Sequence, residues 1–223
     1  MLDFAQARRH MVENQLRTFD VNNLRVLAAF EIVPREFFVS AGREALAYID
    51  QDLPVSDGLG VPERRSMLAP MVLARMIQAL DLDRGAKVLD VACGLGYSSA
   101  VMARLGASVV ALESSPALVK AARERLAASG AEGVAVAQGP LEEGCPDAAP
   151  FDAILVNGSI DRRPDILLRQ LAEGGRLVAI RGRGRAGSTV LFVRSGDAFG
   201  SRSLFDAVAP VLDAFRDEPG FVF

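Results

Sequence analysis

Residues 88–97, VLDVACGLGY, carry the strongest structural signal in this chain. The first four residues suit a buried strand, and the two glycines that follow, Gly94 and Gly96, suit a tight turn. A helical stretch, residues 98–105, comes next. A glycine turn between a strand and a helix lets a ligand approach the backbone, and the start of the helix offers unpaired N–H groups. The stretch therefore predicts a strand–turn–helix unit that binds a ligand.

The sequence on both sides of this unit alternates strands and helices. Apolar runs predict strands at residues 87–91, 108–113, 134–138, 151–157 and 176–180, and helical patterns occupy residues 98–105, 116–129 and 166–171. Late strands at 189–194 and near 204–211 are expected to be antiparallel. Such alternation is typical of an α/β fold with a mostly parallel sheet. We therefore expect an α/β, Rossmann-like sheet, mostly parallel with a late antiparallel strand.

The first 80 residues have a different pattern, which predicts an N-terminal helical extension. An amphipathic helix is expected over residues 5–17, a second after Asn22 or Asn23, and a third after Pro70. Residues 50–66, DQDLPVSDGLGVPERRS, contain two prolines, two glycines and six charged residues, which predicts a loop. We expect residues 1–80 to form an extension with a lid loop, packed on a main domain of residues 81–223.

Composition excludes several classes of protein. The chain has 223 residues, of which 50% are hydrophobic and 24% charged, as in globular domains. The net charge of −3 argues against nucleic-acid binding, and no apolar run reaches the roughly 18–20 residues of a membrane helix. The N-terminus lacks the apolar segment of a secretory signal, so we expect a cytoplasmic protein. We also expect a monomer. One histidine and two cysteines predict neither a metal site nor a histidine base.

Two acidic residues indicate what the turn binds. Asp90 lies four residues before Gly94, and Glu113 lies 19 residues after it, at the end of the next predicted strand. A carboxylate there can accept hydrogen bonds from both hydroxyls of a ribose. A dinucleotide-binding turn would have a third glycine at position 99, where this chain has Ser99. The pattern favours a nucleoside cofactor without a phosphate, such as S-adenosylmethionine. The alternative is an ordinary α/β turn that Asp90 only caps.

The stretch at residues 88–97 resembles the cofactor motif of class I S-adenosylmethionine-dependent methyltransferases. The whole chain resembles the protein-L-isoaspartate O-methyltransferase family, and the segments that carry this resemblance include RRHMV (8–12), VPREFFV (33–39), APMV (69–72), PFDAI (150–154) and QLAEGGRLV (170–178). The resemblance implies a class I methyltransferase fold and S-adenosyl-L-methionine as cofactor. It also implies methylation of the carboxylate of isoaspartyl residues in damaged proteins, which is a protein repair reaction.

Three segments depart from the family pattern. The active-site serine of the family's Thr-Ile-Ser segment falls at Leu68, while Ser66 takes the threonine position, and the loop of residues 56–65 is longer. The family's Gly-Asp-Gly is replaced by residues 139–141, and its Thr-Ala-Ala by residues 157–159. Two alternatives to isoaspartyl methylation therefore stay open. One is a methyltransferase with a changed acceptor, and the other is a non-catalytic cofactor-binding module.

The candidate site residues fall into two groups. Ser66 and Leu68 are the candidate catalytic positions. The candidate cofactor-binding residues are Asp90, Ala92, Cys93, Gly94, Gly96, Tyr97, Glu113, Ser114, Pro140, Leu141 and Asn157.

Structural roles compete with the functional ones at several positions. Cys93 is expected to pack beneath the turn, Asn157 either contacts a ligand or caps the end of its strand, and His10 suits a helix surface. Residues 64–65 could attract an acidic substrate and residues 181–185 could bind RNA. A solvated loop is the simpler interpretation of both basic segments.

Overall fold

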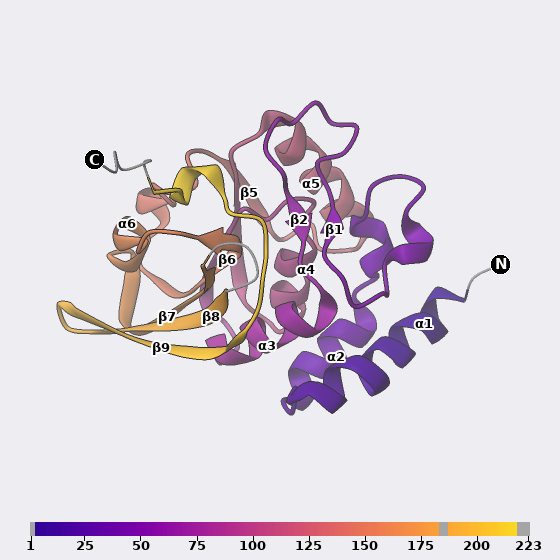
Figure 1. Ribbon diagram of the computed structural model, residues 1–223, viewed down its shortest axis with the longest axis horizontal. Helices are drawn as coiled ribbons and strands as arrows, with labels where there is room; N and C mark the ends of the chain where they lie inside the picture. The colour runs from indigo at the N-terminus through magenta and orange to yellow at the C-terminus, as the bar shows by residue number, and fades with distance from the viewer. Residues whose placement is uncertain (1–2, 183–186, 218–223) are drawn as a thin grey trace, which may run out of the picture.

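A seven-stranded sheet forms the centre of the computed structural model, which describes residues 3–182 and 187–217 (Figure 1). Within this part of the chain the strand order is β5-β4-β3-β6-β7-β8-β9. The strands are β3 (Lys87–Val91), β4 (Ser108–Glu113), β5 (Ala135–Gln138), β6 (Phe151–Ile160), β7 (Leu171–Arg181), β8 (Ser188–Ser195) and β9 (Ala198–Asp206). The first five are parallel, and β8 is antiparallel to both of its neighbours. The expected mostly parallel sheet is therefore confirmed.

The last strand lies earlier in the chain than the sequence indicated. Sequence analysis expected it near residues 204–211, but β9 ends at Asp206. Gly196, with φ of 58°, turns the chain directly after β8, so β9 pairs as a hairpin. Because β9 is an edge strand with mostly exposed residues, it lacks the apolar signature of a buried strand. The apolar residues after 206 instead cross the end of the sheet, where Val211 makes a single bridge to Ser159.

Six α-helices are present among the described residues. They are α1 (Phe4–Met11), α2 (Leu24–Ile32), α3 (Pro70–Leu80), α4 (Tyr97–Arg104), α5 (Pro116–Ala128) and α6 (Asp165–Leu168). A π-helical turn (Val12–Leu16) and a 3-10 turn (Arg17–Phe19) continue α1. The Asn23 side chain caps α2 by accepting a hydrogen bond from the Arg25 N–H at 2.9 Å. Helix α6 is shorter than the expected 166–171, because Leu171 already belongs to β7. None of the described helices is long and apolar enough to cross a membrane.

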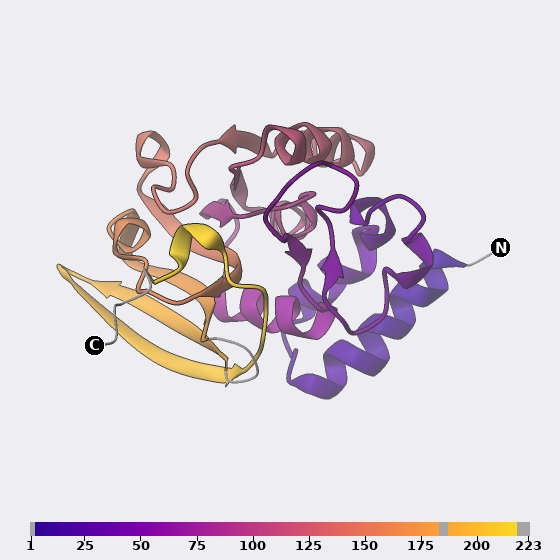
Figure 2. The ribbon, with the colours of Figure 1, turned by 45° about the horizontal axis from the view of Figure 1, so that its top comes forward.

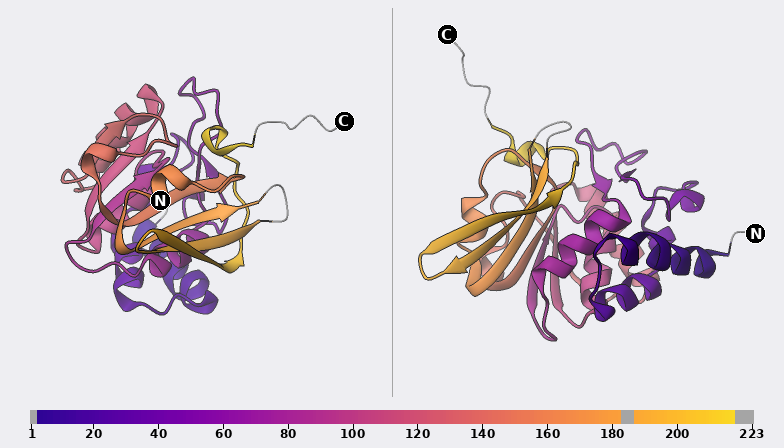
Figure 3. Two further views of the ribbon diagram at one scale, coloured as in Figure 1. Left: turned by 90° about the vertical axis from the view of Figure 1, so that its left-hand side faces the viewer. Right: turned by 60° about the horizontal axis from the view of Figure 1, so that its bottom comes forward.

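The sheet separates two layers of apolar packing. Side chains alternate along β6, so Ala153 and Leu155 join the cluster formed with the N-terminal helices, α4 and α5. Ile154 and Val156 join the opposite cluster, which contains residues of α6 and Phe215 of the C-terminal segment. The N-terminal helices and the β8–β9 hairpin lie at opposite ends of the molecule (Figures 1 and 3).

A small hairpin lies over one end of the sheet. Its strands, β1 (Leu53–Pro54) and β2 (Ser66–Met67), pair antiparallel, and we call residues 53–67 the lid hairpin. Sequence analysis expected only a loop here. The connecting loop extends toward α5 (Figures 1 and 2), and its residues share a pocket with Pro116 and Ala117 of that helix. The hairpin thus covers the carboxyl ends of β3 and β4.

Candidate functional site

The glycine turn follows β3 at the centre of the sheet. Strand β3 pairs with β4 on one side and with β6 on the other, so the strand order reverses at this point. Ligands of open α/β sheets bind outside the carboxyl ends of the strands at such a reversal. The fold therefore puts the turn predicted from sequence at the place where a ligand site is expected.

The backbone of the turn requires its glycines. Ala92, Gly94 and Gly96 all have positive φ, at 57°, 57° and 95°. A Cβ on Gly94 would approach Val55 Cγ2 at 3.1 Å, and one on Gly96 would approach the Leu126 side chain at 3.0 Å. The lid hairpin thus packs directly on the first glycine of the turn, a contact that the sequence did not reveal.

Asp90 is held beneath the turn by three side chains. Its fully buried carboxylate accepts hydrogen bonds from Ser98 Oγ at 2.7 Å, from Asn157 Nδ2 at 2.6 Å and from Ser99 Oγ. Burial raises the pKa of Asp90 to about 6, although these three hydrogen bonds lower it. The contacts link β3 to the first turn of α4 and to β6. They match the interpretation of Asp90 as a cap of the turn, and Asn157 takes part in the same cap.

Glu113 lies at the end of β4 and is also fully buried. Its carboxylate accepts hydrogen bonds from the Gly94 N–H at 3.1 Å and from the Ser114 N–H at 2.8 Å. Arg65 Nε lies 3.3 Å and 3.4 Å from its two oxygens. The backbone therefore fixes the carboxylate beside the glycine turn, as sequence analysis expected, and an arginine of the lid hairpin completes its surroundings.

The two neighbouring arginines of the lid hairpin differ sharply. Arg64 is exposed, as expected for a solvated loop, whereas that expectation is wrong for Arg65, which is 2% exposed. Arg65 also donates to Ser114 Oγ at 3.1 Å and forms an ion pair with Glu63. Burial lowers the pKa of Arg65, but the Glu113 and Glu63 carboxylates outweigh this effect and raise it. Side chains of an extended segment alternate in direction, so position 65 points inward while 64 points to solvent.

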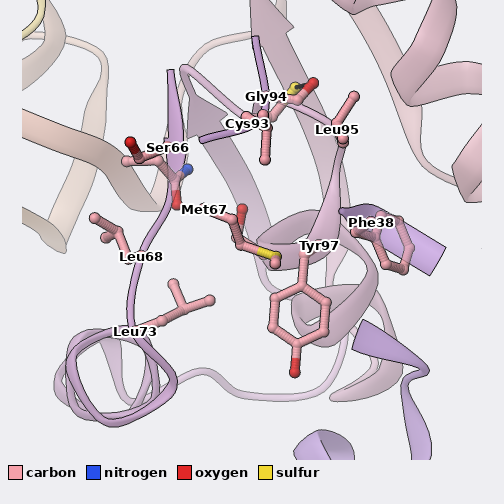
Figure 4. Close-up of a pocket in the computed structure, with 12 residues that line it drawn as sticks. Phe38, Ser66, Met67, Leu68, Leu73, Cys93, Gly94, Leu95 and Tyr97 are labelled. Atoms are coloured by element: carbon pink, nitrogen blue, oxygen red, sulfur yellow. Dashed lines mark hydrogen bonds between the residues drawn. The ribbon is translucent and has the colours of Figure 1, made fainter. Parts of the chain in front are cut away.

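The two candidate catalytic positions, Ser66 and Leu68, lie at the end of the lid hairpin. Ser66 and Leu68 point to one side of this segment and Met67 to the other, toward Tyr97 (Figure 4). The carbonyl of the buried Leu68 accepts a hydrogen bond from Arg35 Nη2 at 2.7 Å. With part of the turn, these residues line a cavity of about 10 Å³. Ser66 and Leu68 therefore share one side of the segment, beside this cavity.

The remaining predicted residues divide into buried and exposed ones. Cys93 is a buried free thiol whose pKa burial raises well above its ordinary value, in keeping with the expected packing beneath the turn. Leu141 is buried in the core beside β6, and Pro140 is exposed at the end of β5. His10 is exposed on α1, as expected. Within the basic segment 181–185, Arg181 is exposed and residues 183–185 lie outside the described residues.

Other residues of the site were missed by sequence analysis. Val55 and Ser98 were not singled out, although Val55 packs on Gly94 and Ser98 donates a hydrogen bond to Asp90. The only signal for Ser98 was a pair of hydroxyl residues at the first turn of a helix after an acidic strand. In the described part of the chain, no group of three or more His, Cys, Asp or Glu side chains could hold a metal ion.

Known proteins of one family are similar to this chain in sequence. The sequence model of the protein-L-isoaspartate(D-aspartate) O-methyltransferase family matches residues 6–206. A protein-L-isoaspartate O-methyltransferase of Methylorubrum populi is 44% identical over 178 residues, which is 80% of each chain. Protein-L-isoaspartate O-methyltransferase 1 of Syntrophobacter fumaroxidans is 39% identical over 198 residues, which is 88% of each.

Solved structures show the same architecture. A protein-L-isoaspartate O-methyltransferase superposes with a TM-score of 0.81 at 26% identity, over 92% of this chain and 65% of that longer one. A putative Plasmodium falciparum protein-L-isoaspartate O-methyltransferase, solved in complex with S-adenosyl-L-homocysteine, has a TM-score of 0.76 at 22% identity. That match covers 93% of this chain and 98% of that one, and at this identity it shows the fold alone. Taken together with the match over residues 6–206, these similarities show that the chain belongs to the protein-L-isoaspartate O-methyltransferase family.

Proposed function

We propose that this protein is an S-adenosyl-L-methionine-dependent methyltransferase that methylates the carboxylate of isoaspartyl residues in proteins. The observation that carries the proposal is the Glu113 carboxylate, fixed beside the glycine turn by the Gly94 and Ser114 N–H groups. The names of the related proteins support the acceptor, and family membership supports the reaction.

The two carboxylate oxygens of Glu113 suit the two hydroxyl groups of a ribose. Arg65 Nε approaches both carboxylate oxygens, at 3.3 Å and 3.4 Å, so both oxygens accept from a donor on the lid side. A cis-diol presents two donors that suit the same pair of oxygens. Ser114 and the backbone of the turn surround this position. We therefore propose that Glu113 holds the ribose hydroxyls of the cofactor and that the turn from Ala92 to Tyr97 lies against it.

The chemistry requires positioning rather than acid–base catalysis. When bound, S-adenosyl-L-methionine supplies an activated methyl group. A carboxylate acceptor is already ionised at pH 7, so a histidine base is not needed. The residues of this chain bind and orient the reactants and exclude water. The buried Val55, Met67 and Leu68 suit the last of these tasks, and we propose that Ser66 contacts the acceptor in place of the family serine at position 68.

Two further features belong to the proposal. Residues 1–80 act as an extension of the main domain, because their apolar residues share one cluster with α4, α5 and the sheet. The free thiols of Cys93 and Cys145 suit a reducing compartment such as the cytoplasm. We also propose that the substrate is a protein or peptide and that the enzyme is a monomer.

The decisive experiment measures cofactor binding and methyl transfer side by side. Calorimetry with S-adenosyl-L-homocysteine tests the cofactor site, and transfer of labelled methyl groups to an isoaspartyl peptide tests the reaction. The matched control is the same peptide with an ordinary aspartyl residue. Binding together with transfer to the isoaspartyl peptide alone supports the proposal. Binding without transfer to either peptide favours a changed acceptor or a non-catalytic module, and absence of both contradicts the proposal.

A further inference from the structure

A buried ion pair joins the lid hairpin to the end of β4. Arg65 is 2% exposed and Glu113 is 0% exposed, so neither charge is solvated by bulk water. Arg65 bonds both oxygens of Glu113 and the adjacent Ser114 hydroxyl. Burying an arginine is costly unless its charge is compensated, which makes this contact a specific feature of the hairpin and not an incidental one.

The same carboxylate has no capacity for a second set of donors. A carboxylate has about four lone-pair positions. Glu113 Oε2 accepts from the Gly94 N–H, Oε1 accepts from the Ser114 N–H and hydroxyl, and Arg65 Nε approaches the remaining face of both oxygens. A ribose diol would need that remaining face. Arg65 and a ribose therefore exclude each other at Glu113.

We propose that Arg65 competes with the ribose of the cofactor for Glu113, so that the lid hairpin moves before the cofactor binds. This inference rests on the proposed function, because it takes Glu113 as the ribose-binding residue. Arg65 is then a residue that sets cofactor affinity and the rate of cofactor entry, without being part of the binding surface itself.

The hairpin is built so that both of its contacts with the site release together. Val55, which packs on Gly94, donates its N–H to the Arg65 carbonyl at 2.9 Å across the hairpin. A movement of the hairpin backbone that takes Arg65 away from Glu113 therefore also withdraws Val55 from the turn. This coupling opens the ribose position and the backbone approach of the glycine turn in one movement.

Arg65 keeps a partner when it leaves Glu113. Glu63 lies two residues away on the same loop, is paired with Arg65, and is only partly buried. Gly58 and Gly60 of this loop face open space, because a Cβ on either would have no heavy atom within 4 Å. A pocket of about 480 Å³ lies between the loop and the start of α5, lined by Arg65, Ser114 and loop residues. The displaced arginine thus moves toward solvent with a compensating charge.

The test compares the Arg65→Gln variant with Arg64→Gln, a matched control that removes an exposed arginine from the neighbouring position. The probe is S-adenosyl-L-homocysteine, with affinity measured by calorimetry and association followed by stopped-flow. We expect Arg65→Gln to tighten binding by about tenfold, which corresponds to about 1.4 kcal/mol. Association of the probe should also be faster in this variant. Arg64→Gln should match the wild type.

The outcomes separate this inference from the function on which it rests. If the wild type binds S-adenosyl-L-homocysteine and Arg65→Gln binds it with equal or lower affinity, the competition is overturned and the cofactor site stands. Failure of the wild type and of both variants to bind overturns the cofactor site and, with it, the competition. If Arg65→Gln does not fold, Arg65→Lys replaces it. Arg65 holds this position through Nε on both Glu113 oxygens and Nη2 on Ser114 Oγ. A lysine ammonium is one compact group that cannot occupy both of these positions, so its hold on Glu113 is weaker and binding should still tighten. An affinity no higher than that of the wild type contradicts the inference.

Discussion

At the scale of single residues, the buried carboxylate of Asp90 makes stability depend on pH. Burial raises its pKa to about 6, from an ordinary value near 4. The folded protein therefore keeps a proton that the unfolded chain loses in this interval, so the contribution is fully present below about pH 4 and is lost as the pH rises through about 6. Relative to Asp90→Asn, the wild type should lose about 2–3 kcal/mol of unfolding free energy between these values.

Urea unfolding of both proteins at a series of pH values measures this difference. The Asp90→Asn variant has no titrating group at this position, so other carboxylates cancel in the comparison. Parallel stability curves for the two proteins would contradict the raised pKa of Asp90.

Ser66 gives a second prediction at the residue scale, for activity. If its hydroxyl contacts the acceptor, Ser66→Ala should lower kcat/KM for an isoaspartyl peptide by about ten- to a hundredfold, the effect of losing about 1–3 kcal/mol. The control is Ser201→Ala, because Ser201 is exposed on β9. Equal rates for both variants would show that the serine at position 66 does not replace the family serine.

Glu113 and Arg65 show which site residues can be predicted from the sequence and which cannot. Glu113 was predicted because its strand, its spacing from Gly94 and its charge all lie within one local pattern. Arg65 was not, because its partner is 48 residues away and nothing in the loop sequence distinguishes it from Arg64. Long-range pairing of a loop residue leaves no periodic signal, so the residue that completes the Glu113 site required the structure.

At the scale of elements, α3 begins without a capping side chain of its own. Ala69 occupies the cap position, and two loop carboxylates take over this role. Asp52 Oδ1 accepts from the Ala69 N–H at 2.7 Å, and Asp50 Oδ1 accepts from the Met71 N–H at 3.2 Å. The helix that follows the acceptor segment is therefore anchored from the loop before the lid hairpin.

Removing this anchor should destabilise the protein. We expect Asp52→Ala to lower the free energy of unfolding by about 1–2 kcal/mol, as for a lost helix cap. Asp83→Ala, at an exposed aspartate, should change it by less than about 0.5 kcal/mol. Urea unfolding of the two variants measures both values, and equal losses would argue against the capping role.

Prediction of whole elements succeeded where they are buried and failed at the edge. Strand β4 has the bounds expected from sequence, Ser108–Glu113, because its apolar run is enclosed by neighbouring strands. Strand β9 was placed too late, since its exposed residues carry no such run. The small β1–β2 pairing was missed because two residues on each side leave no detectable alternation.

At the scale of the whole molecule, the N-terminal helices are bound closely to the sheet domain. Phe30 of α2 meets the Tyr97 ring of α4 edge-on, with ring centroids 5.9 Å apart. Arg25 donates to the Leu105 and Leu82 carbonyls at 2.7 Å and 3.1 Å. The proposed extension of residues 1–80 should therefore not unfold separately from the main domain.

Two optical probes test this cooperativity. Far-UV circular dichroism follows the helices, and the near-UV tyrosine signal reports on Tyr97 beside the glycine turn and on Tyr48 in the extension. We expect the two urea transitions to coincide, as in two-state unfolding. A separate early loss of helix signal would indicate that the extension is an independent unit.

One contact of the lid hairpin spans most of the chain. Glu63 Oε1 accepts a hydrogen bond from the Asp213 N–H at 2.8 Å, across 150 residues of sequence. A ribosome adds about 5–20 residues per second, so Asp213 is made about 8–30 s after Glu63. Arg65 and Glu113 are only 48 residues apart. Both residues of the buried pair are therefore synthesised well before the outer tether can form, so the two contacts that fasten the hairpin become available at different stages of translation.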